Sequence, residues 1–203
     1  INSNENRGNT MIIKNGLVFT PEGTFEKKDL YIEGEYISNK TTDNKEVEAE
    51  GCYVIPGLVD IHFHGCVRHD MCDGTEESIQ ALADYEAANG VLAICPATMT
   101  IPEDQLMQAM KAAKEHKNGK GADLVGINME GPFVNKEKKG AQKEEDIKTA
   151  DVDFFHRMQE AAGGLVKLID LAPETEGAME FIDQVKDEVH VSIAHTTADY
   201  DTA

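Results

Sequence analysis

Residues 11–50 alternate short apolar runs with turn residues, which is the pattern of a small β structure. Two apolar runs flank Lys14-Asn15-Gly16, and an Asn-Gly pair favours a tight turn that needs positive φ. Two further runs flank Glu33-Gly34-Glu35, a second hairpin signal. We therefore predict a small β module over residues 11–52, with no candidate catalytic group in it.

From residue 53 the pattern changes to apolar runs of strand length that alternate with amphipathic helical stretches. The expected strands are 53–62, 91–97, 123–130, 165–171 and 189–195. This alternation predicts parallel βαβ units of an α/β fold. The spacing of the strands fits a (β/α)8 TIM barrel, which needs roughly 250 residues, so about five units fit into residues 53–203. A Rossmann fold is the alternative, but no G-x-G-x-x-G motif follows a strand.

Helix ends support this division. One helix is expected from Thr75 to Ala88, because Asn89-Gly90 then provides a C-terminal cap. A second is expected to begin at Thr100-Ile101-Pro102-Glu103, with Thr100 as the N-cap. Two more are expected over 151–162 and 176–185, the first of them ended by glycines.

Composition and charge exclude several classes of function. The net charge of −19 argues against nucleic-acid binding, which needs clustered Lys and Arg. No apolar run reaches the ~18–20 residues of a membrane span, and no export signal is visible. Four cysteines without a C-x-x-C pair predict reduced thiols and a cytoplasmic location. Residues 1–10 are polar and patternless, so we treat them as a leader or a cloning scar.

Candidate chemistry lies at the ends of alternate strands. His62 and His64 end the first strand, and residues i and i+2 of a strand point to the same side. Glu130 ends the third strand and His195 the fifth, at intervals of 66 and 65 residues, or two βα units each. Because alternate strands of a barrel supply one layer of side chains, we expect these four residues to converge on a metal site.

The mixture of imidazole and carboxylate groups favours Zn²⁺ or Fe²⁺ over Mg²⁺, which prefers oxygen ligands. Four such groups suit either one ion or two. Thiolate ligation by Cys66 and Cys72 is a minor alternative, because a third and fourth soft ligand are missing.

These residues also carry a family resemblance. The segment 56–65, which contains His62 and His64, resembles the first-strand motif of the amidohydrolase superfamily. Glu130-Gly131-Pro132-Phe133, Leu171-Ala172-Pro173-Glu174 and Ala194-His195-Thr196-Thr197-Ala198 are similar to the N-acetylglucosamine-6-phosphate deacetylases within it. The resemblance covers residues 11–203, and it is specific because a Glu from strand three replaces the bridging Lys of most amidohydrolases.

The resemblance implies a TIM barrel flanked by a small β-sandwich, here its N-terminal part over residues 53–203. It implies hydrolysis of the acetamide of N-acetylglucosamine 6-phosphate, in amino-sugar catabolism. Glu130 and His195 would be metal ligands, and His62 and His64 would bind a second metal in members that keep the pair. Ala141 and Gln142 would contact substrate, with Gln142 standing where the family often has His.

The resemblance also implies a homodimer and a catalytic Asp that lies beyond residue 203, so we expect the chain itself to show little or no turnover. Two other readings stay open. A cyclic-amide hydrolase would need a Lys at the end of strand four, whereas Lys167 lies early in it. The chain could also be an inactive fragment, since half a barrel exposes strand edges.

Overall fold

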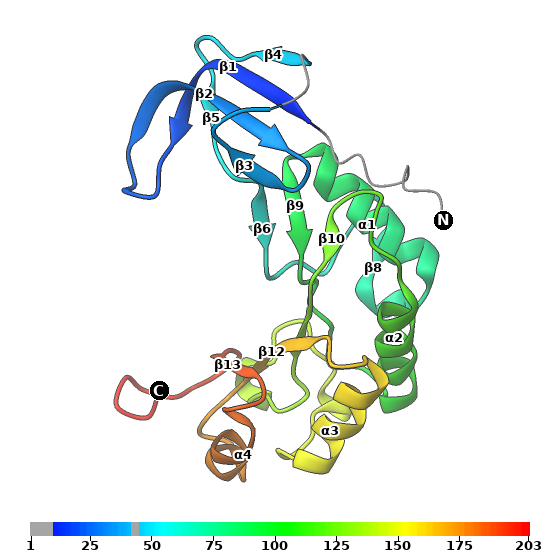
Figure 1. Cartoon of the computed structure of the whole chain (residues 1–203). Coiled ribbons are helices and arrows are strands. Elements are labelled where there is room, and N and C mark those ends of the chain that lie inside the picture. Colours follow the sequence, from blue (N-terminus) through cyan, green and yellow to red (C-terminus); the bar gives the residue numbers. More distant parts are fainter. Residues whose placement is uncertain (1–9, 42–44) are drawn as a thin grey trace. The chain divides into compact units, whose positions relative to one another are not determined.

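The computed structural model describes residues 10–41 and 45–203. It divides the chain into two compact units, Ile1–Pro56 and Gly57–Ala203, here named the N-terminal unit and the α/β unit. Figure 1 shows strands alone in the first and strands alternating with helices in the second. The predicted leader lies outside the described residues, except for Thr10.

The N-terminal unit contains one mixed sheet in the order β3-β2-β1-β4, with β5 also paired to β1. Its strands are β1 (Met11–Phe19), β2 (Phe25–Glu33), β3 (Tyr36–Ser38), β4 (Glu46–Glu48) and β5 (Tyr53–Val54). β1 pairs antiparallel with β2 and parallel with β4 and β5. The described residues of this unit form a single sheet, so a sandwich stays a prediction.

One predicted turn in this sheet is wrong. Lys14-Asn15-Gly16 does not reverse the chain but forms a bulge within β1, where Asn15 has φ 62° and the register with β2 shifts. The carboxylate of Asp29 accepts the Asn15 N–H at 2.9 Å, which satisfies the donor that the bulge removes from the ladder. The chain reverses at Thr20–Thr24 instead. The hairpin at Glu33-Gly34-Glu35 is confirmed, with Gly34 at φ 67°.

The α/β unit contains two three-stranded parallel sheets, β10-β9-β6 and β11-β12-β13. The strands are β6 (Leu58–Asp60), β9 (Val91–Ile94), β10 (Asp123–Leu124), β11 (Ile127–Glu130), β12 (Val166–Leu171) and β13 (His190–Ile193). A parallel bridge between Ala97 and Asn128 connects the sheets. The α/β class is confirmed, but the described residues form no closed barrel.

Two expected strands are interrupted. Residues 53–62 are not one strand, because β5 joins the N-terminal sheet while β6 pairs with β9. Pro56 stands between them and has no N–H to donate to a ladder. Residues 123–130 divide into β10 and β11, so the first part pairs with β9 and the second with β12.

Helices lie between the strands as predicted. They are α1 (Glu76–Ala88), α2 (Glu103–Glu115), α3 (Val152–Ala161) and α4 (Ala178–Val185). The predicted cap at Thr100 is wrong, because Pro102 is extended and α2 begins after it without a side-chain cap. No helix among the described residues is long and apolar enough to span a membrane.

Short elements complete the α/β unit. A small antiparallel pair, β7 (Gly65–Cys66) and β8 (His69–Asp70), leads into the 3-10 helix η1 (Met71–Asp73). Two further 3-10 helices, η2 (Lys136–Lys138) and η3 (Glu144–Asp146), lie in the long connection after β11.

The apolar core of the α/β unit anchors that connection. Phe133 is fully buried three residues after Glu130, and its ring centroid lies 5.9 Å from that of Phe154 and 5.0 Å from that of Phe181. These rings come from α3 and α4. Aromatic packing therefore fixes the chain immediately after Glu130, at the end of a strand that is itself buried.

Candidate metal centre

His62 and His64 lie in the segment that follows β6, not on a strand as predicted. Asp60 accepts the His62 N–H at 3.0 Å, and the backbone carbonyls of Phe63 and His64 accept hydrogen bonds from Ala97 and Met71. These contacts fix an extended loop. The two rings lie edge to face, with centroids 5.3 Å apart.

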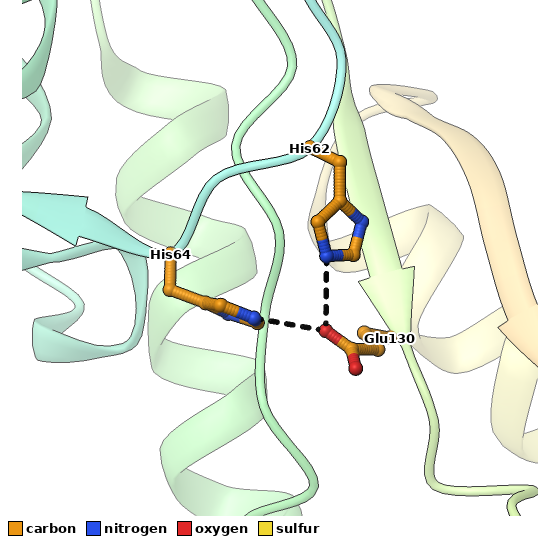
Figure 2. Close-up of side chains that lie close together, drawn as sticks. All are labelled: His62, His64 and Glu130. Carbon is orange, nitrogen blue, oxygen red and sulfur yellow. Dashed lines mark ion pairs between the residues drawn. The ribbon is translucent and has the colours of Figure 1, made fainter. Parts of the chain in front are cut away.

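Glu130 brings the histidine pair together with β11. It is 4% exposed, and its Oε2 lies 3.0 Å from Nε2 of His64 and 3.4 Å from Nε2 of His62 (Figure 2). Neither Oε2 of Glu130 nor Nδ1 of His64 has a hydrogen-bond partner, although both atoms are buried. Ligand atoms of these three residues all lie within 4.8 Å of one another, close enough to hold one metal ion.

His195 lies on the other side of the same carboxylate. Its Nε2 contacts Oε1 of Glu130, and its Nδ1 lies 2.8 Å from the carbonyl oxygen of Lys138. Because a carbonyl only accepts, Nδ1 carries a proton and Nε2 is the atom available to a ligand partner. His195 has φ 49°, a left-handed conformation that is uncommon outside glycine and that clusters at functional sites.

The protonation of His195 depends on these neighbours. Burial lowers the pKa of the imidazole, but the Lys138 carbonyl and the Glu130 carboxylate act in the opposite direction, and the net shift is upward. The proton on Nε2 therefore occupies the position that a metal ion would take, so metal binding and this proton compete.

Gln142 is buried, at 2% exposure, and both ends of its amide are used. Its Nε2 donates to Oε1 of Glu130 at 3.1 Å, and its Oε1 accepts the Thr100 N–H at 2.6 Å. Oε1 of Glu130 is thus held by Gln142 and His195, while Oε2 faces the histidine pair. Ala141 is exposed beside it. Substrate contacts by Ala141 and Gln142 stay predictions.

Two buried polar residues of the site did not emerge from the sequence. Asp170 of β12 is 2% exposed, lies opposite Glu130 in the ladder, and has its Oδ2 3.4 Å from Nδ1 of His62. Burial raises its pKa. Asn128 of β11 donates to the Ile61 carbonyl at 3.3 Å and lies 3.0 Å from His62 Nδ1. A charged residue inside the apolar run Val166–Leu171 was the available signal.

The cysteines do not join this group. The described residues give one cluster of potential metal ligands, and it contains neither Cys66 nor Cys72. The Sγ of Cys72 accepts the Met99 N–H at 3.2 Å, and burial raises its pKa to about 12. Cys72 is therefore a protonated thiol at neutral pH, which disfavours the thiolate alternative.

Several curated proteins have sequences related to this chain. The chain is 34% identical to the N-acetylglucosamine-6-phosphate deacetylase of Bacillus subtilis over 201 residues, 93% of this chain and 48% of that protein. It is 27% identical to the enzyme of the same name from Lysinibacillus sphaericus over 202 residues, 95% of this chain and 52% of that one. This chain resembles the N-acetylglucosamine-6-phosphate deacetylases along nearly its whole length. It spans about half the length of these curated relatives, and no protein-family model matches it.

Solved N-acetylglucosamine-6-phosphate deacetylases share the fold of this chain over about half of their own length. A mutant enzyme from Mycobacterium smegmatis, in complex with N-acetyl-D-glucosamine-6-phosphate, matches with a TM-score of 0.84 at 23% identity over 96% of this chain and 52% of that one. The enzyme from Pasteurella multocida matches with a TM-score of 0.83 at 21% identity over 95% and 52%. The resemblance predicted from the strand-end motifs is thus confirmed.

Proposed function

We propose that this chain carries the metal-binding part of a deacetylase that hydrolyses the acetamide of N-acetylglucosamine 6-phosphate to glucosamine 6-phosphate and acetate. The observation that carries the proposal is the buried Glu130 carboxylate with imidazoles of His62, His64 and His195 around it. The names of the related enzymes supply the substrate.

The donor set fits a divalent cation. Two imidazole nitrogens and a buried carboxylate oxygen without a hydrogen bond face one another, an arrangement that a positive ion between them would stabilise. Imidazole and carboxylate ligands favour Zn²⁺ or Fe²⁺. Because the two oxygens of Glu130 face different histidines, we propose one ion at the Oε1 side with His195 and room for a second at the Oε2 side with His62 and His64.

A metal bound here would supply Lewis-acid chemistry, acidifying a water molecule and polarising an amide carbonyl. The chain's own residues orient the ligands. The Lys138 carbonyl accepts a proton from Nδ1 of His195, so this imidazole presents Nε2 to the site. Asp170 and Asn128 lie 3.4 and 3.0 Å from Nδ1 of His62 and hold that ring from behind. Gln142 holds Oε1 of Glu130 through its amide.

We extend the proposal to the barrel, the substrate side, the oligomeric state and the location. The parallel strands would form part of the wall of a (β/α)8 barrel, and the side of the site next to Ala141 and Gln142 would meet the phosphosugar. The homodimer and the cytoplasmic location are retained as predictions.

A cyclic-amide hydrolase is the weaker alternative. Such an enzyme would need a Lys at the end of β12, but the last two residues of that strand are the buried Asp170 and Leu171. Lys167 is exposed and donates to the Gly164 carbonyl at 2.8 Å. A linear amide therefore remains the better substrate class.

Two separate measurements test the proposal: the metal content tests the site, and deacetylation tests the substrate. The purified chain is loaded with Zn²⁺, or with Fe²⁺ under anaerobic conditions, and bound metal is counted by elemental analysis. We expect Glu130→Gln to lose metal at both sides, and the double change His62→Gln, His64→Gln to lose it at one. His190→Gln is the matched control, because His190 is exposed at the opposite end of β13 from His195.

Turnover is measured as acetate release in a protein of the length of the relatives. N-acetylgalactosamine 6-phosphate is the competing substrate, because a deacetylase of that name from Escherichia coli O157:H7 is 26% identical over 193 residues. Unchanged metal content in Glu130→Gln would refute the site. Metal binding without hydrolysis of either sugar would refute the substrate assignment.

A further inference from the structure

Glu174 connects three loops at the edge of the site. It lies four residues after Asp170, in the loop that follows β12, and its carboxylate accepts hydrogen bonds from the loops after β11 and β13. Asn135 Nδ2 donates to Oε1 at 2.7 Å, and the Thr197 N–H and hydroxyl donate to the same oxygen at 2.7 and 3.0 Å. The Thr196 hydroxyl donates to Oε2 at 2.5 Å.

This carboxylate is charged at any physiological pH. Partial burial raises its pKa, but the hydrogen bonds from Thr196, Thr197 and Asn135 outweigh that effect and lower it to about 2. Four donors from two different loops are thus directed at one carboxylate. The Glu174 carboxylate therefore links the loop after β11 to the loop after β13.

The groups that Glu174 holds are the ones that fix His195. Thr196 and Thr197 are the two residues that follow His195. Asn135 also contacts His195 directly, because its N–H donates to the His195 carbonyl at 3.0 Å. Asn135 also caps η2, since its side chain accepts the Glu137 N–H at 2.9 Å and its carbonyl accepts the Lys138 N–H at 3.0 Å.

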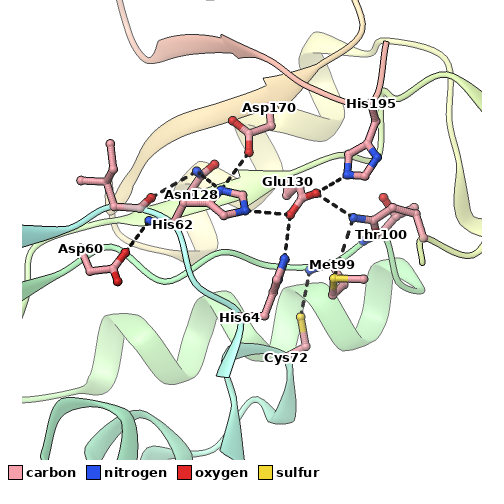
Figure 3. A network of polar contacts seen from close by, with 12 residues as sticks. Asp60, His62, His64, Cys72, Met99, Thr100, Asn128, Glu130, Asp170 and His195 are labelled. Atoms are coloured by element: carbon pink, nitrogen blue, oxygen red, sulfur yellow. Dashed lines mark hydrogen bonds and ion pairs between the residues drawn. The ribbon is translucent and has the colours of Figure 1, made fainter. Parts of the chain in front are cut away.

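That short helix ends at Lys138, whose carbonyl accepts the proton on Nδ1 of His195. A chain of contacts thus runs from Glu174 through Asn135 and η2 to the imidazole, and a second runs through Thr196 to the backbone of His195. Both converge on a residue in a left-handed conformation, which needs such support to persist. Figure 3 shows the imidazole directed at Glu130.

We propose that Glu174 is a positioning residue of the site: its carboxylate ties the loops after β11 and β13 together so that His195 keeps Nδ1 on the Lys138 carbonyl and presents Nε2 to Glu130. The inference rests on the proposed function in giving His195 a metal to bind. It differs from a purely structural tie, because it links Glu174 to the tautomer of one imidazole.

The test compares Glu174→Gln with Glu176→Gln, an exposed carboxylate two residues away. Nitrogen-15 NMR of histidine-labelled, metal-free chain, recorded over a pH series, reports which nitrogen of each ring is protonated. We expect His195 to be protonated at Nδ1 in the wild type and in Glu176→Gln, and to become a mixture of tautomers in Glu174→Gln. The His190 signal should not change, since His190 lies at the far end of β13.

Cobalt titration is the second readout. Loss of a residue that orients a metal ligand typically weakens metal binding about 10–100-fold, so we expect that loss in Glu174→Gln and less than about twofold in Glu176→Gln. Thr196→Val removes the hydroxyl that donates to Glu174 and accepts the Ala198 N–H, but it leaves the other three donors to Glu174 in place. We expect it to give the same changes in smaller measure, so it replaces Glu174→Gln if that variant does not fold.

Either result can overturn the inference. An unchanged His195 tautomer in Glu174→Gln, or in Thr196→Val if only that variant folds, would reduce Glu174 to a structural tie. Failure of the proposed function has a different signature: the wild type binds no cobalt, while the tautomer measurement on metal-free chain still decides the role of Glu174.

Discussion

The N-terminal unit and the α/β unit differ in how far they remove side chains from water. Among the described residues of the N-terminal unit, the buried side chains are Val18, Thr20 and Ala49, and its ion pairs lie on the surface. The α/β unit buries a continuous apolar cluster from all four helices and from β9, β10, β11 and β12. Among the described residues, buried carboxylates occur in this second unit alone, at Glu86, Glu130 and Asp170.

This difference shows what a polar site needs from its surroundings. A buried carboxylate is tolerated only where partners are fixed around it, and those partners stay fixed only if the chain behind them is packed. Glu130 meets both conditions, with Gln142 and His195 on one oxygen and Phe133 anchoring the following residues. The N-terminal sheet offers no comparable enclosure among its described residues.

The largest contrast is expected from aromatic truncation. Phe181→Ala should destabilise the α/β unit by about 3–5 kcal/mol, because it opens a cavity next to Phe133 and Phe155. Tyr36→Ala should change the N-terminal unit by less than about 0.5 kcal/mol, because Tyr36 is 75% exposed. Amide hydrogen exchange, resolved by peptide, measures the two units separately. Equal losses would contradict the contrast in burial.

Thiol reactivity should separate the units next. Cys52 of the N-terminal unit is exposed, whereas Cys95 of the α/β unit is buried and burial raises its pKa to about 11. At pH 8 we expect iodoacetamide to modify Cys52 at least about 100-fold faster, because the thiolate is the nucleophile and Cys95 is both protonated and enclosed. Mass spectrometry of the digested chain gives the order, and comparable rates would show that the α/β unit opens readily.

The same raised pKa predicts a pH dependence of stability. Below pH 9 the thiol of Cys95 is protonated in the folded and unfolded chains, so it has no effect. As pH rises from about 9 through about 11, the unfolded chain ionises first and stability is lost. Cys95→Ala should lack this part of the alkaline loss. A parallel alkaline decline in both proteins would show that other groups cause it.

The smallest effect is expected from the surface charges of the N-terminal sheet. Lys27 and Glu50 lie 3.2 Å apart, but their side chains are 60% and 71% exposed. Glu50→Gln should change the stability of the N-terminal unit by no more than about 0.5 kcal/mol, and by less in 1 M salt. Denaturant titration at two salt concentrations measures this. A loss that persists in high salt would mean that the sheet depends on charge after all.

Much of the fold was predictable because it depends on local chemistry. The N-cap residues Thr75 and Asp151 start their helices where expected, since each satisfies a free N–H of the first turn. The bulge at Asn15 was not predictable, because an Asn-Gly pair suits a bulge as well as a hairpin, and the partner Asp29 is distant in sequence. The conformation of Asn15 is therefore set by the strand and side chain that pair with it, and not by its local sequence preference.

The proximity of the candidate ligands was predictable from the sequence, but the contacts of the residues that hold them in place were not. The two-unit spacing of Glu130 and His195 brought them together as expected, because parallel strands end at one edge. Asp170 and Gln142 gave no periodic signal, since their importance lies in which atoms they face across the sheet and the loop. Only the folded arrangement assigns such atoms to one another.

The contact between His195 and Lys138 uses a carbonyl oxygen of the main chain, which every amino acid possesses. Lys138 can therefore be replaced by almost any residue that keeps η2 intact, and the hydrogen bond to Nδ1 of His195 is retained. Variation of the side chain at position 138 would therefore not show that the position is unimportant for His195. The orientation of His195 therefore depends on the backbone conformation of η2 and not on the side chain at position 138.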